Sequence, residues 1–164
     1  MSYLIEVIND LEYAIDESHL VDAASAVLDQ HDTDAESGLS IVFVDDAGMQ
    51  KMNLQFRGID APTDVLSFPA DAPPVDLPDV PPYLGDLLIA YPYATAQAAR
   101  EGHALRDSLA LLVVHGTLHL LGYDHDTPEN KAEMWAAQED ALKSLGISAA
   151  IVPPLEGNGD DQFD

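Results

Sequence analysis

The sequence of 164 residues has no cysteine, few basic residues and no long apolar run. Without cysteine the chain has neither disulfide bonds nor thiolate metal ligands, which fits a reducing compartment. No stretch approaches the roughly eighteen uninterrupted apolar residues that a membrane-spanning helix requires, and the first residues do not resemble a secretory signal. We therefore expect a cytoplasmic protein that does not enter a membrane.

Positive charge is also scarce in the composition. Six Lys and Arg residues face thirty Asp and Glu residues, which gives a formal net charge of −24 at pH 7. Because affinity for nucleic acids normally comes from clustered Lys and Arg that release counterions, composition alone argues against nucleic-acid binding. Such a surface is typical of a solubilising coat, of which adaptation to a salty cytoplasm is one specific form.

Local patterns in the chain predict strands and helices in the N-terminal half and helices alone in the C-terminal half. The predicted strands are 3–8, 39–44, 64–69 and 85–90, and the predicted helices are 17–30, from Asp45 or Asp46 to Phe56, 95–101, 105–121 and 128–145. In the second helix, Met49, Met52 and Leu54 or Phe56 are expected to face inward. Five prolines and three aspartates predict an exposed loop over residues 71–82.

The length is that of one domain with its own apolar core. We predict a single domain over residues 1–152, followed by an acidic, disordered tail over residues 153–164 that is rich in glycine and aspartate. Apolar residues lie on nearly every side of helix 105–121, so this helix is expected to be central to the core.

Three histidines stand within eleven residues, in the segment H-G-T-L-H-L-L-G-Y-D-H from His115 to His125. Residues four apart share one face of a helix, so His115 and His119 can direct their imidazoles at one ion. Gly122 tolerates the left-handed conformation that ends a helix and can bring His125 back toward the pair. Three imidazoles with an open fourth position are typical of catalytic zinc sites. We predict one zinc ion per chain, with nickel as a substitute.

Any one of these histidines, taken alone, is more simply a hydrogen-bonded residue of the core or its rim; the spacing of the three favours a metal site. The remaining histidines lack such spacing and are interpreted as polar surface residues: His19, His31 and His103.

The spacing also equals that of the metalloprotease pattern H-E-x-x-H-x-x-G-x-x-H, but Gly116 stands at the glutamate position. That glutamate is the general base for peptide hydrolysis, so its absence argues against a protease. Met134 lies beside Trp135 in a predicted helix and is interpreted as a core residue rather than part of a Met-turn. A metzincin-like protease and a non-catalytic metal-binding or ribosome-binding module remain the alternatives.

Together with Gly85-Asp86 and the segment F-R-G-I-D-A-P-T-D-V-L-S-F-P from Phe56 to Pro69, the histidine motif closely resembles the YbeY family of bacterial metal-dependent endoribonucleases. The resemblance covers about residues 3–147. It implies an α/β (α+β) fold: a small mixed sheet, here of four strands, packed with about five helices around a central metal-bearing helix. It also implies cleavage of single-stranded RNA in ribosomal RNA maturation and ribosome quality control. The implied partners are ribosomal RNA and the ribosome or a ribosomal protein.

Arg57 is the only basic residue in these motifs. Its planar guanidinium suits the extra negative charge on a pentacoordinate phosphorus, and the resemblance points to the same residue as catalytic. Three aspartates are candidates to orient imidazole N–H groups, although each could instead cap a turn: Asp86, Asp124 and Asp126.

Overall fold

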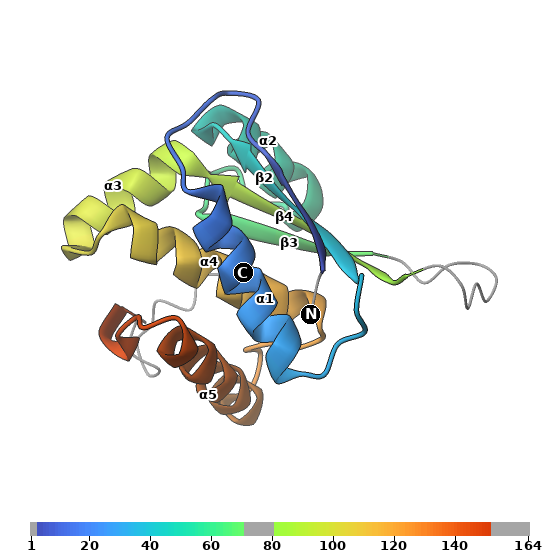
Figure 1. Ribbon diagram of the computed structural model, residues 1–164. Helices are drawn as coiled ribbons and strands as arrows, with labels where there is room; N and C mark the ends of the chain where they lie inside the picture. Colours follow the sequence, from blue (N-terminus) through green and yellow to red (C-terminus); the bar gives the residue numbers. More distant parts are fainter. Residues whose placement is uncertain (1–2, 71–80, 152–164) are drawn as a thin grey trace.

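The computed structural model describes residues 3–70 and 81–151 of the chain, and in this part four strands and five α-helices form an α/β fold (Figure 1). The predicted fold class is therefore confirmed. The predicted acidic tail, and residues 71–80 of the predicted loop, lie outside the described residues. In chain order the elements are β1 (Leu4–Ile8), α1 (Glu17–Gln30), β2 (Gly38–Val44), α2 (Asp46–Arg57), β3 (Val65–Pro69), β4 (Tyr83–Ala90), α3 (Tyr91–Glu101), α4 (Leu105–Leu120), α5 (Pro128–Ser144) and a short 3₁₀ helix (Ala149–Ile151).

The sheet is mixed, with strand order β1-β2-β4-β3. Strand β2 pairs in parallel with β1 and with β4, and β3 pairs antiparallel to β4. Parallel neighbours need crossover connections, and helices supply them here. Strand β3 is therefore an edge strand of this sheet.

Side chains of the strands alternate between two apolar layers, as the period of a strand requires. Leu39, Ile41 and Phe43 of β2 belong to the larger core, which they form with α1, α4 and α5. Met49 of α2 packs in a second, smaller cluster on the other face, together with Leu66 and residues of β4. Figure 1 shows α2 on one side of the sheet and α4 and α5 on the other.

Helix α4 is buried along most of its length, because it lies between the sheet and helices α1, α3 and α5. It lies close against the sheet at Gly116, where a Cβ atom would lie 2.7 Å from Cδ2 of Leu87. The hydroxyl of Ser67 donates a hydrogen bond to the Gly116 carbonyl at 3.4 Å. The expectation that this helix is central to the core is therefore confirmed. No helix in residues 3–70 and 81–151 is both long and apolar enough to cross a membrane.

Three expectations about the helices need correction. Helix α3 begins at Tyr91 rather than at residue 95, because Pro92 occupies the first turn, where its missing N–H costs nothing. Neither Leu54 nor Phe56 faces inward: 49% of the former and 55% of the latter is exposed. His19 is buried, with 7% exposed, because it lies on the apolar face of α1.

Candidate metal centre

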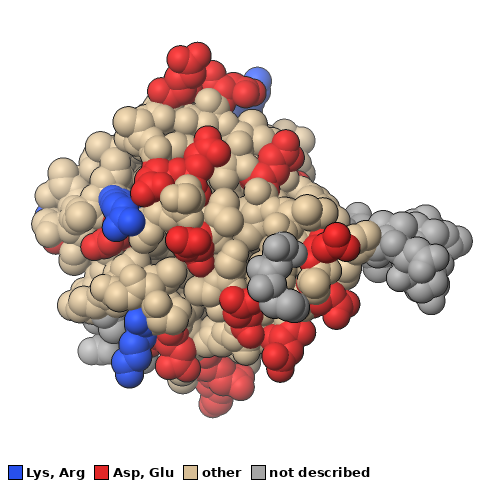
Figure 2. Space-filling view, in the orientation of Figure 1, with Lys and Arg blue, Asp and Glu red and all other residues tan. Residues whose placement is uncertain are grey.

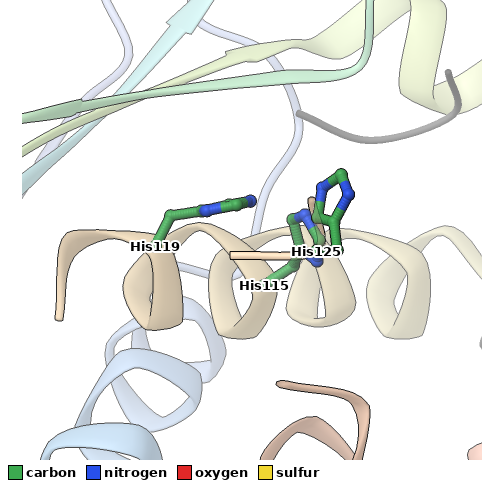
Figure 3. A group of neighbouring side chains, drawn as sticks. All are labelled: His115, His119 and His125. Carbon is green, nitrogen blue, oxygen red and sulfur yellow. The ribbon is translucent and has the colours of Figure 1, made fainter. Parts of the chain in front are cut away.

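The three predicted histidines converge in the structure. Ring nitrogens of His115, His119 and His125, one from each residue, all lie within 4.8 Å of one another. Figure 3 shows the three imidazoles gathered beside the ribbon of α4. His115 is buried and the other two are half-buried, so the group lies at the end of the core rather than on the open surface.

The helix and the turn that follows it bring the histidines together. His115 and His119 are one turn apart on α4, and Gly122 then adopts φ +103°, the left-handed region predicted for it. The N–H groups of Gly122 and Tyr123 donate to the carbonyls of His119 and Leu118, both at 3.0 Å. These bonds end the helix and reverse the chain, and His125 follows in the loop before α5.

Two hydrogen bonds orient the rings of α4. Nδ1 of His115 lies 2.9 Å from Oε1 of Gln138, a wholly buried residue of α5. Nδ1 of His119 lies 2.9 Å from the carbonyl oxygen of Tyr123. Both partner oxygens can only accept, so each Nδ1 carries the proton and the lone pair is on Nε2. This is the tautomer that a metal-ligating histidine needs when it binds through Nε2.

The chemistry of the donor set fits a divalent metal ion. Nε2 of His125 is buried and has no hydrogen-bond partner among the described residues. Buried polar atoms are rarely left in this state without a water or an ion. Imidazole nitrogens suit zinc and nickel, and three protein ligands leave a position open on a four-coordinate ion. Among the described residues the group has three members, so the structure offers no fourth side chain that would close it.

Helix α5 forms one wall of the centre. The indole of Trp135 meets the rings of His115 and His125 edge to face, at centroid distances of 5.8 and 5.6 Å. Sequence reasoning missed both Trp135 and Gln138 as parts of the site. One signal was present: Gln138 is a polar residue on the buried stripe of α5 that includes Met134 and Ala141. Met134 is a core residue, as predicted, with no exposed surface.

The aspartates proposed as acceptors for the imidazoles have other partners. Asp124 accepts from the backbone N–H of His125 at 2.8 Å, and Asp126 accepts from Nδ2 of Asn130 at 2.8 Å. The bond from Asn130 is the main reason that the pKa of Asp126 is lowered from its usual value. Asp86 accepts from the hydroxyl of Tyr83. Asp124 and Asp126 thus stabilise the loop and the start of α5, the turn role that the sequence left open.

Arg57 is the last residue of α2 and is exposed. Its Nη1 lies 3.5 Å from Oδ1 of Asn53, whose buried side chain in turn donates to the carbonyl of Ala61 at 2.8 Å. Next to it, Phe56 contacts Phe68 of the edge strand β3. Helix α2, which carries Arg57, packs on one face of the sheet, and α4, which carries His115 and His119, packs on the other. Both helices contact β3.

The position of the protease glutamate is packed against the sheet. A Cβ atom at Gly116 would lie 2.7 Å from Cδ2 of Leu87 and 3.3 Å from the hydroxyl of Ser67. A longer side chain would therefore collide with β3 and β4. The local packing excludes a general base at this position and so disfavours the protease alternative.

The fold and the three histidines define a class: α/β proteins whose histidine centre can hold one metal ion. Comparison with known proteins assigns the chain within it. The model of the family "Endoribonuclease YbeY" matches residues 6–146, so the chain belongs to the YbeY endoribonuclease family. Proteins named Endoribonuclease YbeY from Roseiflexus sp. and Mycolicibacterium smegmatis are 43% and 41% identical to it, over 88% and 85% of this chain and 92% and 81% of their own length. The solution structure of a Thermotoga maritima protein has the same fold, with a TM-score of 0.54 and 22% identity over 86% of this chain and 91% of that one.

Proposed function

We propose that this chain is a zinc-dependent endoribonuclease that cleaves single-stranded RNA in the maturation of ribosomal RNA and in ribosome quality control. Its catalytic domain spans residues 1–152. We expect it to act in the cytoplasm, with ribosomal RNA and the ribosome or a ribosomal protein as its partners. Membership of the endoribonuclease family supports the reaction class. Nickel is expected to substitute for zinc, because imidazole ligands accept both ions.

The observation that carries the proposal is the geometry of the three histidines. Two of them present Nε2 because Nδ1 is held by Gln138 and by the Tyr123 carbonyl, and Nε2 of the third is buried without a partner among the described residues. When bound there, a zinc ion supplies Lewis-acid activation of water or of a phosphoryl oxygen. The imidazoles would hold the ion as neutral donors, and the indole of Trp135 packs against two of them from the α5 side.

We assign to Arg57 the stabilisation of negative charge on the phosphate that is cleaved. A guanidinium donates several hydrogen bonds in one plane and stays charged at every relevant pH. Asn53 holds the guanidinium on its side of α2 through the contact to Nη1.

The test is a cleavage assay with the purified full chain loaded with zinc. We expect endonucleolytic cleavage of a fluorescent single-stranded RNA, slower cleavage of the matching duplex, and no hydrolysis of casein. A chelator should stop the reaction and added zinc should restore it. Hydrolysis of casein with intact RNA would favour the protease, and stable metal binding without any cleavage would favour the non-catalytic module.

A further inference from the structure

An acidic endoribonuclease has few basic side chains with which to hold RNA. The chain has six basic residues against thirty acidic ones. Figure 2 shows, on the face drawn, acidic side chains in many places and basic ones in a few isolated places. Counterion release by Lys and Arg therefore cannot provide most of the affinity, and a contact that does not depend on charge has to contribute.

Phe56 offers such a contact. It was expected to face the core, yet 55% of the residue is exposed on the last turn of α2. Its ring meets the ring of Phe68 edge to face, with centroids 5.1 Å apart and planes at 73°. A ring held in this way has lost part of its freedom before any ligand arrives, which lowers the cost of binding on it.

The residue next to Phe56 is Arg57, to which the proposed function assigns a phosphate contact. An exposed aromatic residue followed in the chain by an exposed arginine matches the two parts of a nucleotide: the ring can stack on the base and the guanidinium can bind the phosphate. Phe56 and Arg57 thus offer one contact for a base and one for a phosphate. An apolar protein partner would have no use for the guanidinium.

The position of Phe68 relates this ring to the histidine centre. Phe68 faces the α2 side of β3, whereas the preceding residue, Ser67, donates to Gly116 of α4 on the other side. Gly85, opposite the end of β3, is so tightly enclosed that a Cβ atom there would lie 2.3 Å from the Phe68 carbonyl and 2.9 Å from Leu120 Cδ2. Strand β3 therefore separates Phe56 from the helix of the histidines, with no further element between them.

We propose that Phe56 is a stacking platform for one unpaired base of the RNA substrate, next to the phosphate held by Arg57. The proposal rests on the proposed function and adds to it the contact that positions the strand. A base inside a duplex is stacked on its neighbours and cannot use the ring, so Phe56 also favours single strands. Stacking accepts every base, so the contact adds affinity without strong sequence preference.

The experiment compares variants of the zinc-loaded full chain in single-stranded RNA cleavage. Phe56→Ala and Phe56→Leu should raise KM by about 5- to 150-fold, the range for loss of one base–aromatic stack, with kcat changed much less. Phe56→Tyr keeps an aromatic face and should stay close to wild type. Leu54→Ala is the matched control, because Leu54 is 49% exposed on the same helix. Thermal unfolding of each variant identifies any loss of structure, and wild-type KM in Phe56→Leu would overturn the proposal.

A binding measurement separates this proposal from the proposed function. A single-stranded 2′-O-methyl oligonucleotide keeps the bases and resists cleavage, so its affinity can be measured by fluorescence anisotropy. Replacing one nucleotide at a time by an abasic one should weaken binding to wild type at one position and have no further effect there in Phe56→Ala. If wild type binds the oligonucleotide but does not cleave RNA, the proposed function fails and the abasic scan still decides the role of Phe56. Equal losses at every position in both proteins would overturn the stacking platform alone.

Discussion

Nδ1 of His115 and Oε1 of Gln138 lie 2.9 Å apart, and neither residue has any exposed surface. The bond joins α4 to α5 at the histidine centre. It fixes both the tautomer and the rotation of the His115 ring, so it prepares the ring for an ion before the ion arrives.

Removing this acceptor should weaken the centre. Gln138→Ala is expected to lower zinc affinity by about 10- to 100-fold, the usual effect of losing a partner behind a ligand, as measured by competition with a chromophoric chelator. Gln30→Ala is the control, because Gln30 donates to the backbone of the same helix, at the Ala137 carbonyl, and not to a ring of the histidine centre. Equal zinc affinity in wild type and Gln138→Ala would contradict the orienting role.

The metal content itself depends on the three histidines. The purified chain should contain about one zinc, or nickel after purification on nickel resin, because imidazole sites accept both ions. His119→Ala should lose it, whereas His103→Ala should not, and elemental analysis measures both. Full metal content in His119→Ala would rule out this centre.

Arg57 should act in the chemistry and not in the scaffold. Arg57→Ala is expected to keep its zinc and its melting temperature while cleaving RNA about 100- to 1000-fold more slowly, the effect of losing one donor to a charged transition state. Arg100→Ala removes an exposed arginine at the end of α3 and should cleave normally. If Arg57→Ala cleaves at the wild-type rate, the assignment is wrong.

Gly116 should be required for packing even though alanine is the better helix former. Gly116→Ala puts a Cβ atom 2.7 Å from Cδ2 of Leu87, a residue with no exposed surface whose side chain would have to shift within the core, so we expect a loss of about 1–3 kcal/mol in the free energy of unfolding. Urea denaturation measures the loss. In combination with Leu87→Ala the two costs should not add, because the first change fills space that the second one empties. Simple additivity would show that the contact is not responsible.

Salt should not inhibit the enzyme as it inhibits a basic nuclease. With one or two phosphate contacts, each contributing a log-log slope of about −0.7 on single strands, the loss of affinity is shallow. Screening of the −24 net charge works in the opposite direction, since the Debye length falls from about 10 Å at 0.1 M to about 3 Å at 1 M. Cleavage and thermal stability should therefore stay level or improve between about 0.1 and 1 M KCl. A steep fall in activity with the metal still bound would reveal a basic groove.

The local features of the site could be predicted from the sequence because they depend on neighbours in the chain. The positions of His115 and His119 follow from the helical period, and the turn at Gly122 follows from the freedom of glycine. The strands and most helix limits follow in the same way. The exposed Phe56 did not follow, because the apolar pattern of α2 does not show which of its apolar residues the sheet covers.

Contacts between distant segments could not be predicted in this way. The acceptor behind His115 is 23 residues further on, in another helix, so nearby aspartates looked equally suitable. The strand order β1-β2-β4-β3 likewise depends on how helices pack on both faces. Gln138 could be noticed as a polar residue on a buried stripe, but only the packing of α5 on α4 shows what it contacts.

The closeness of the three ligands in the chain has a consequence for how the protein folds. The chain segment between His115 and His125 is short, so little entropy is lost when its ends meet, whereas pairing β1 with β2 and β2 with β4 closes much longer loops. Contacts of short range form faster than contacts of long range. Helix α4 and its turn can therefore gather the ligands before the strands have paired, and a metal ion captured at that stage would become a nucleus on which the rest of the chain assembles.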